Sequence, residues 1–226
     1  MSTYFTVNLC VVIIPVMLSF DKRVAFYRSW KYVFPAIAIT AFLFIFWDIV
    51  FTSLGVWSFN PNHVSPVNIF GIPLEEVLFF FVIPYASLFT YEVLKAYIKK
   101  DFPEYITRYL IGFLTTFLII IAVTNFNHLY TFFSFTILAI LLFFLQFVFK
   151  VSYLGRFILA YGVVLVPFLV VNSILTGSFL KEPVVMYNDC ENMGIRIFTI
   201  PFEDIFYGML LILLNVSIYE KLKNMN

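Results

Sequence analysis

The sequence predicts an all-α, polytopic membrane protein with seven transmembrane helices. Three observations predict it: the composition, the spacing of long apolar runs and the distribution of positive charge. Of the 226 residues, 62% are hydrophobic and 12% are charged, with a mean hydropathy of +0.98, whereas soluble domains are about 45–50% apolar and about 25% charged. This composition excludes a water-soluble domain and a disordered chain. A net charge of +1 also argues against binding to nucleic acid, which needs a basic surface.

A bilayer-spanning helix needs about 20 apolar residues, and seven runs approach that length. They cover residues 4–20, 33–51, 72–94, 105–124, 129–149, 157–175 and 201–219. The first run has neither a positive segment before it nor a small-residue cleavage site after it, so it is interpreted as a span and not as a signal peptide. The fourth and fifth runs are divided only by the short polar turn from Asn125 to His128.

The Lys and Arg residues fall mostly in every second connection between the spans, as expected if the chain crosses the membrane seven times. Of the 14 Lys and Arg residues, 12 fall in the 1–2, 3–4 and 5–6 connections and in the C-terminal tail, whereas Lys181 and Arg196 fall on the other side. Since Lys and Arg collect in cytoplasmic loops, the sequence predicts a protein of the cytoplasmic membrane. Its N-terminus would lie outside and its C-terminus in the cytoplasm.

The chain contains an internal repeat. The segment 73–76, Pro-Leu-Glu-Glu, is matched by 201–204, Pro-Phe-Glu-Asp, and in both copies a further glutamate, Glu92 or Glu220, follows the first by 17 residues. Each copy begins a span, and the two spans are four apart, so both run in the same direction across the membrane. We therefore predict a parallel 3+1+3 arrangement. Its parts are a first three-helix repeat at 1–94, a connector helix and turn at 95–128, and a second three-helix repeat at 129–226.

Five carboxyl groups are expected near the outer ends of spans 2, 3 and 7: Asp48, Glu75, Glu76, Glu203 and Asp204. One interpretation is structural, because prolines and acidic residues in a first helical turn suit the helix dipole. The other is functional, because acidic residues inside a membrane usually belong to a site. The length of the last span favours the functional interpretation. Residues 205–219 would make a helix of about 22 Å, short of the ~30 Å hydrocarbon core, so Glu203 and Asp204 would lie below the membrane surface.

Buried carboxyl groups without a basic partner favour the neutral form, and several together would place a proton donor beside a proton acceptor. Aromatic residues share helix faces with these acids, in the pairs Glu75/Phe79, Glu76/Phe80 and Glu203/Tyr207. Aromatic faces beside acids suit a cationic intermediate. Glu92 and Glu220, which lie near Lys95 and Lys221, are interpreted as interfacial residues instead.

Several metal and cofactor sites find no support in the sequence. The two histidines, His63 and His128, lie in separate outer loops, and the two cysteines, Cys10 and Cys190, form no Cys-x-x-Cys motif, which argues against zinc and histidine-rich di-iron sites. No Gly-x-Gly-x-x-Gly fingerprint supports a flavin or nicotinamide site. There is no aspartate-rich diphosphate motif, and residues 201–219 contain no lysine for a retinal Schiff base. We therefore expect a site that uses no metal and no cofactor.

Two copies of one pattern run through the chain, comprising Trp47-Asp48, 55–61 and 73–80 in the first half and Asn172 and 201–207 in the second. Together they resemble the integral-membrane, non-flavin lycopene cyclases, whose two halves are separate subunits in some bacteria and fused in others. The chain is similar to the fused form over nearly its whole length. The resemblance implies that lycopene and other carotenoids of the lipid bilayer are the substrates. It implies protonation of the acyclic ψ-end at C2, ring closure and proton loss to give a β-ionone ring, without net redox change.

The same resemblance implies an acid–base set of Glu75, Glu76, Glu203 and Asp204, with Asp48 as a further member, and leaves open which one donates the proton. The residues expected to contact the substrate are Trp47, Trp57, Asn60, Phe79, Phe80, Asn172 and Tyr207, with Trp57 and Asn60 at the mouth. Asp48 in one half corresponds to Asn172 in the other, so we expect one working site and not two identical ones. The ring type, the number of ends cyclised, and association with another copy or with other carotenoid enzymes stay open.

Two other functions fit parts of the pattern. A proton-coupled transporter would also use buried acids and parallel repeats, but matching breaks in both repeats are then expected, and Pro84 in span 3 has no counterpart at 211–213 in span 7. Uptake into vesicles without carotenoid conversion would favour a transporter. A structural partner subunit is the third alternative, and its deletion would leave the pigment chemistry intact.

Overall fold

Seven α-helices form most of the structure, a computed structural model that describes residues 2–225. They are α1 (Thr3–Leu18), α2 (Trp30–Ser53), α3 (Leu74–Tyr97), α4 (Glu104–Thr124), α5 (Leu129–Phe143), α6 (Leu154–Leu175) and α7 (Glu203–Asn224). A short 3₁₀ helix, Phe26–Ser29, precedes α2, and a π-helical turn, Phe144–Val148, extends α5. Six helices are long and apolar enough to cross a membrane, whereas α1 is a shorter apolar helix of 16 residues. The predicted crossing by α1 therefore stays a prediction.

α7 is longer than the predicted span, because it continues past Tyr219 to Asn224 and has 22 residues, or about 33 Å at 1.5 Å per residue. That length includes Glu203 and Asp204 in the first turn and two lysines in the last turn. The depth of Glu203 and Asp204 in the membrane stays a prediction, but both side chains are buried within the protein.

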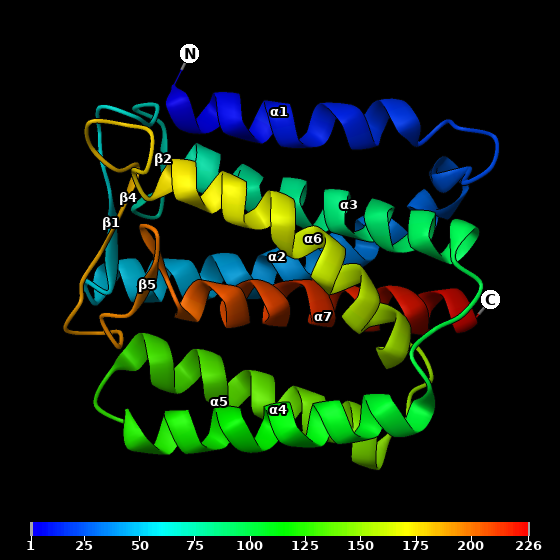
Figure 1. Cartoon of the computed structure of the whole chain (residues 1–226). Helices are drawn as coiled ribbons and strands as arrows, with labels where there is room; N and C mark the ends of the chain where they lie inside the picture. The colour runs from blue at the N-terminus through cyan, green and yellow to red at the C-terminus, as the bar shows by residue number, and fades with distance from the viewer. Residues whose placement is uncertain (1, 226) are drawn as a thin grey trace.

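The helices lie side by side with their axes roughly aligned, and consecutive helices are joined at alternate ends of the bundle (Figure 1). The strands and the N-terminus lie at one end, called here the strand end, and the C-terminus lies at the other, called the tail end. α3 and α7, which carry the two motifs, pack against each other, with α2 and α6 against both of them. α1 covers α3, α5 covers α7, and α4 packs mainly on α5. The two motif helices therefore form the centre of the molecule.

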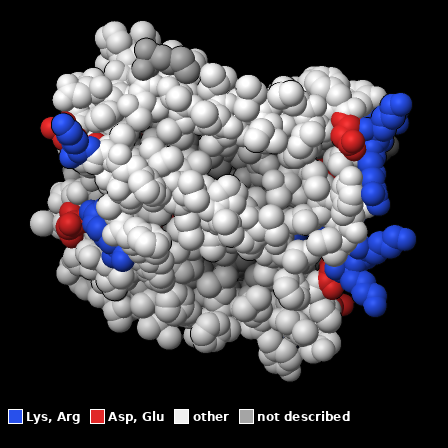
Figure 2. Space-filling view, turned by 45° about the horizontal axis from the view of Figure 1, so that its top comes forward, with Lys and Arg blue, Asp and Glu red and all other residues white. Residues whose placement is uncertain are grey.

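Charged side chains gather at the two ends of the bundle. On the face shown in Figure 2, the belt between the strand end at left and the tail end at right is almost entirely uncharged. The 12 Lys and Arg residues predicted to share one side of the membrane belong to the helix ends, connections and tail at the tail end, because alternate connections share an end (Figure 1). An apolar belt between polar ends is the surface expected of a protein embedded in a bilayer.

A short β-hairpin leads into each motif helix. The hairpins are β2 (Asn68–Ile69) with β3 (Ile72–Pro73), and β5 (Arg196–Ile197) with β6 (Ile200–Pro201). In each turn a phenylalanine, Phe70 or Phe198, has a positive φ, of 50° or 56°, and a largely exposed side chain. No strand is predicted here from the sequence, because two-residue strands are too short to show alternation. The hairpins fix where α3 and α7 begin and so place the acidic residues that follow.

The two long outer loops pair with each other. β1 (Trp57–Phe59), from the loop between α2 and α3, runs antiparallel to β4 (Val185–Tyr187), from the loop between α6 and α7. Two backbone hydrogen bonds of 2.9 Å extend the pair, from the Asn60 N–H to the Val184 carbonyl and from the Asn188 N–H to the Val56 carbonyl. This pairing joins the two halves of the chain over the strand end of the helices (Figure 1).

At the tail end, α3 and α7 exchange ion pairs. The Lys95 ammonium of α3 lies 3.0 Å from the Glu220 carboxylate of α7, and the Lys223 ammonium of α7 lies 3.0 Å from the Glu92 carboxylate of α3. Both glutamates thus contact lysines at the end of the bundle, as interfacial residues would, but each partner lies on the other helix. These contacts are far along the helices from the acidic first turns.

Candidate active site

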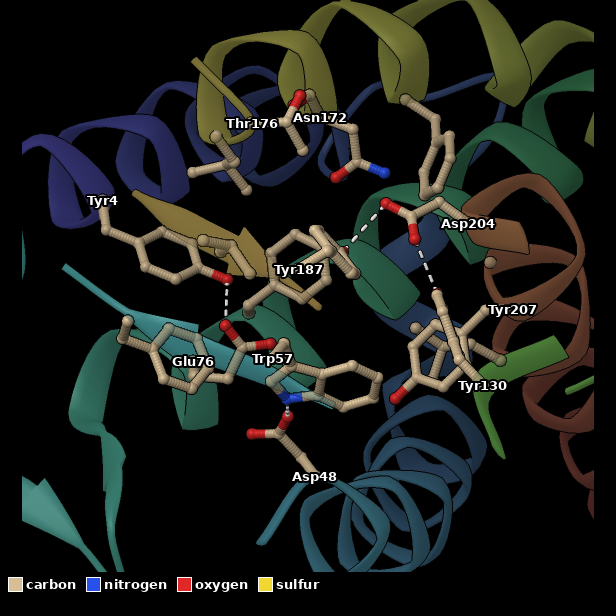
Figure 3. Close-up of a pocket in the computed structure, with 17 residues that line it drawn as sticks. Tyr4, Asp48, Trp57, Glu76, Tyr130, Asn172, Thr176, Tyr187, Asp204 and Tyr207 are labelled. Atoms are coloured by element: carbon tan, nitrogen blue, oxygen red, sulfur yellow. Dashed lines mark hydrogen bonds between the residues drawn. The ribbon is translucent and has the colours of Figure 1, made fainter. Parts of the chain in front are cut away.

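One pocket at the strand end contains three of the five predicted carboxyl groups. It lies among α1, α2, α3, α5, α6 and α7, beneath β1 and β4, and its cavity has a volume of about 50 Å³. Pockets that hold drug-sized molecules have volumes of about 300–1,000 Å³, so a ligand of that size fits here only when side chains of the lining move apart. Asp48, Glu76 and Asp204 line the pocket and are buried, and Figure 3 shows them around one space. Side chains that are far apart in the sequence thus meet at one site.

Glu76 and Asp204, at the second acidic position of each motif, accept tyrosine hydroxyl groups. The Tyr4 hydroxyl of α1 donates to Oε2 of Glu76 at 2.6 Å, and the Tyr130 hydroxyl of α5 donates to Oδ1 of Asp204 at 2.6 Å. The Tyr187 hydroxyl of β4 donates to the other oxygen of Asp204 at 3.0 Å. The two carboxyl groups lie on opposite sides of the pocket (Figure 3). A substrate between them would have a carboxyl group on each side.

Glu75 and Glu203, at the first acidic position, hold the loops instead. Each accepts a backbone N–H from ten residues earlier and a hydroxyl from the beginning of α1 or α5. The donors are Ser65 N–H (2.8 Å) and Ser2 Oγ (2.5 Å) for Glu75, and Met193 N–H (2.8 Å) and Thr131 Oγ1 (2.6 Å) for Glu203. Neither glutamate lines the pocket. Their contacts fix the loops to the motif helices beside the pocket.

Asp48 lies near the end of α2 and is the third carboxyl group of the pocket. The Trp57 indole N–H donates to its Oδ1 at 2.5 Å. Its Oδ2 is buried and has no hydrogen-bond partner among residues 2–225. Asn172 of α6, the counterpart of Asp48 in the second half, also lines the pocket. The pocket is therefore more acidic on the side of the first half.

Aromatic rings form much of the pocket wall. Four residues predicted to contact the substrate line it: Trp57, Phe79, Asn172 and Tyr207. Trp47 and Phe80 lie behind this lining. The Trp47 ring packs on that of Tyr207 with centroids 5.6 Å apart, and the Phe80 ring lies 6.0 Å from that of Phe44.

The Tyr207 hydroxyl is buried without a hydrogen-bond partner within the described part of the chain. Its ring centroid lies 5.8 Å from that of Tyr130 and 6.2 Å from that of Trp57. A buried hydroxyl without a partner costs about 1–3 kcal/mol. Because Tyr207 lines the pocket, its hydroxyl is available to a bound molecule.

Asn60 lies in the loops that cover the pocket and not in its lining. Its side-chain amide donates to Oε2 of Glu182 at 3.0 Å, which joins the loop after β1 to the loop before β4. The hydrogen bonds from Asn60 and Asn62 hold the pKa of the Glu182 carboxyl below its ordinary value. Asn60 thus contributes to the cover of the pocket.

The pocket has no cationic partner for its acids. Among residues 2–225, no Lys, Arg or His lines it, and no group of three or more His, Cys, Asp or Glu side chains could hold a metal ion. Burial raises the pKa of the Tyr187 hydroxyl well above its ordinary value, and the nearby Asp204 raises it further, so Tyr187 keeps its proton and remains a donor. Carboxyl groups with hydroxyl donors and aromatic faces can transfer protons and stabilise a nearby cation.

Ten residues of the lining were not among the predicted site residues, and four of them carry aromatic rings that the argument uses: Tyr4, Tyr130, Phe168 and Tyr187. A signal existed for Tyr4 and Tyr130, because each lies at the start of the first helix of a predicted repeat. An alignment of residues 1–94 with residues 129–226 would have placed these two tyrosines together. Tyr187 and Phe168 had no such signal, because their contacts depend on how the loops and α6 fold over the bundle.

A comparison with known families gives one match. The family model described as lycopene cyclase matches residues 1–94 and 127–222, which include all or most of every helix except α4 and all the residues of the pocket. No curated protein and no solved structure matches the chain.

Proposed function

Since the chain belongs to the lycopene cyclase family and is thus an enzyme that acts on carotenoids, we propose that it is a lycopene β-cyclase. The observation that carries this proposal is the position of Glu76 and Asp204. They lie on opposite sides of one buried pocket (Figure 3), and each accepts a tyrosine hydroxyl at 2.6 Å. This arrangement supplies a proton donor and a proton acceptor without a metal or a basic side chain.

The proposed reaction moves one proton in and one proton out. A carboxylic acid protonates C2 of the ψ-end, and the electrons of the C1=C2 bond form the new C–H bond, which leaves a cation at C1. The C5=C6 electrons then form the C1–C6 bond and leave the cation at C5. A carboxylate removes the proton from C6, and the electrons of that C–H bond close the C5=C6 double bond of the β-ionone ring. The substrate and the product have the same composition, so no oxidant or reductant is consumed.

The contacts favour Asp204 as the proton acceptor. Both of its oxygens accept hydroxyl donors, from Tyr130 and Tyr187, which suits the anionic form because hydrogen bonds to a charged group are strong. Glu76 accepts a single hydroxyl, and Asp48 has an oxygen without a partner. These two residues therefore form the acidic side of the pocket, with Glu76 as the proposed donor to C2.

The aromatic wall would protect the cation. The rings of Trp57, Tyr130 and Tyr207 lie within 6.2 Å of one another, and a cation over an aromatic face is stabilised by about 0.5–2 kcal/mol. β1 and β4 pair over the strand end of the helices (Figure 1), and residues of both strands line the pocket. This cover would exclude water that could add to the cation.

We also propose that the chain crosses the membrane seven times as two fused, parallel repeats. Contacts that recur 128 residues apart support the repeat: Glu75 corresponds to Glu203, and Lys95 to Lys223. The hairpins before α3 and α7 recur at the same interval. The two motif helices would then be related by an axis near the membrane normal, which passes close to the pocket.

Expression in cells that accumulate lycopene, followed by chromatography of the pigments, tests the function. The wild-type chain should convert lycopene to monocyclic or bicyclic carotene with β-rings. Glu76→Gln should lose at least about 10²-fold in turnover, because proton transfer by a positioned group contributes about 10²–10⁴-fold, while the protein still accumulates in the membrane. A wild-type chain that leaves lycopene unchanged, or a fully active Glu76→Gln variant, would overturn the proposal.

A further inference from the structure

The proposed function requires an entrance that faces the lipid. Only the end of a linear polyene reacts, so the rest of the chain must extend from the pocket into the hydrocarbon. The strand end is covered by β1 and β4, which line the pocket through Trp57 and Tyr187. The entrance must therefore lie between helices. The following inference rests on the proposed function in this respect.

The two halves of the chain differ at one packed contact. In the first half, Phe44 lies four residues before Asp48, and its ring packs on that of Phe80 with centroids 6.0 Å apart. In the second half, Phe168 lies four residues before Asn172, but the position that corresponds to Phe80 is Gly208. The second half thus has one aromatic ring where the first half has two.

The Phe168 ring occupies the space that this glycine leaves. A Cβ atom at Gly208 would lie 2.8 Å from two carbons of the ring, closer than real contacts of this kind. The ring therefore lies directly against the bare backbone of α7. Phe168 and Gly208 both line the pocket, as does Leu211. On α7, Gly208 lies one helical turn after Asp204, which also lines the pocket. A molecule that displaced the ring from Gly208 would be led along α7 to the acceptor carboxylate.

A single helix, α6, lies between the contact of Phe168 with Gly208 and the outer surface of the bundle. Val166 and Val170 are 66% and 55% exposed on its outer face, whereas Phe168 is buried. Pro167, inside the helix, cannot donate the backbone hydrogen bond to residue 163, and such prolines bend or weaken a helix. α6 changes direction partway along its length (Figure 1). Phe168 therefore directly follows a proline at which α6 is bent or weakened.

We propose that Phe168 closes an opening between α6 and α7, through which the end of the polyene enters the pocket from the bilayer over Gly208. The chain of the substrate then lies against the α7 backbone at Gly208, with its end between Glu76 and Asp204. The corresponding contact in the first half is filled by the rings of Phe44 and Phe80, so the entrance is proposed for the second half alone.

Paired substitutions test the contact. Gly208→Ala should lower kcat/KM by about tenfold, mainly through KM, because the added methyl group overpacks the place where the polyene is proposed to lie against α7. Phe168→Leu in the same chain should restore most of the loss. Gly162→Ala, also in a helix but with open space around its Cβ, should have no effect. A Gly208→Ala variant with normal kcat/KM, or one that the second change does not improve, would contradict the proposal.

Cysteine labelling tests whether residue 168 lies at an entrance for the substrate or only packs against Gly208. Cys10 and Cys190 are exposed, so both are replaced by serine, and Phe168→Cys and Val166→Cys are compared with a membrane-permeant thiol reagent. The Phe168→Cys variant should react, and added lycopene should slow its reaction, whereas squalane should not. The Val166→Cys variant should react equally in all cases. No reaction at 168, or a reaction that lycopene leaves unchanged, would overturn the proposed entrance. Protection without conversion of lycopene would support the entrance and contradict the proposed function.

Discussion

The hydroxyl of Tyr4 lies 2.6 Å from Oε2 of Glu76, across 72 residues of sequence. The hydroxyl of Tyr130 lies at the same distance from Oδ1 of Asp204, across 74 residues. Each tyrosine comes from the first turn of α1 or α5, and each carboxyl group comes from the first turn of α3 or α7. The two bonds therefore hold the carboxyl groups of the pocket in fixed orientations.

Tyr4→Phe and Tyr130→Phe should each lower turnover by on the order of 10²-fold, because small displacements of a reacting group have effects of that size. Each should also lower the free energy of unfolding by about 1–3 kcal/mol, since one oxygen of a buried carboxyl group loses its hydroxyl donor. Tyr91→Phe is the matched control. It removes a 2.7 Å hydroxyl bond to Glu220 at the tail end and should reduce stability alone. Pigment chromatography and thermal unfolding in detergent measure the two effects, and equal turnover losses in all three variants would contradict this assignment.

The two acidic positions of each motif should respond differently to amide substitution. Glu75→Gln keeps an acceptor for Ser65 N–H but weakens a charge-assisted bond, so the variant should unfold at a lower temperature while each folded molecule keeps most of its turnover. Glu76→Gln should show the reverse, with normal unfolding and little turnover. The comparison is made per molecule, after quantifying the protein in membranes. A stable but inactive Glu75→Gln variant would return Glu75 to the set of reacting groups.

Apolar length and charge alternation were sufficient to predict the seven helices, because both are local properties of the sequence. The repeated acidic motif indicated the place of the pocket, since two of its four carboxyl groups, those of Glu76 and Asp204, line it. The different roles of Glu75 and Glu76 were not visible. Adjacent residues in a first turn point in different directions, and their partners, such as Ser65 and Tyr4, lie in other elements.

Tyr207→Phe should raise stability and lower activity together. The hydroxyl has no partner within residues 2–225, so its removal should relieve about 1–3 kcal/mol of desolvation cost. Turnover should nevertheless fall if the hydroxyl faces the developing charge between Glu76 and Asp204. Phe206→Leu, on a face of α7 that packs against Phe135, serves as a control that should lower stability. An unchanged turnover in Tyr207→Phe would show that the ring alone is needed.

The orientation of the bundle can be tested with a natural cysteine. Cys190 is exposed in the loop between α6 and α7, which lies at the strand end and is predicted to be outside. A membrane-impermeant maleimide should therefore label Cys190 in intact cells. Ser152→Cys, in the connection between α5 and α6 and on a Cys190→Ser background, should be labelled only after the membrane is opened. The opposite pattern would place the tail end outside and contradict the distribution of positive charge.

The exchanged ion pairs at the tail end should stabilise the contact between α3 and α7 without affecting catalysis. In the pair of Lys95 and Glu220, the lysine side chain is 44% exposed and the glutamate side chain 7% exposed. Removing Lys95 leaves a buried carboxylate without its cation, whereas removing Glu220 leaves a lysine that can turn to water. Lys95→Ala should therefore lower the unfolding temperature more than Glu220→Ala, and the double variant should lose less than the sum of the two. Turnover should stay normal in all three, because the pair lies at the opposite end of α7 from Asp204, and a smaller effect of Lys95→Ala than of Glu220→Ala would contradict this account.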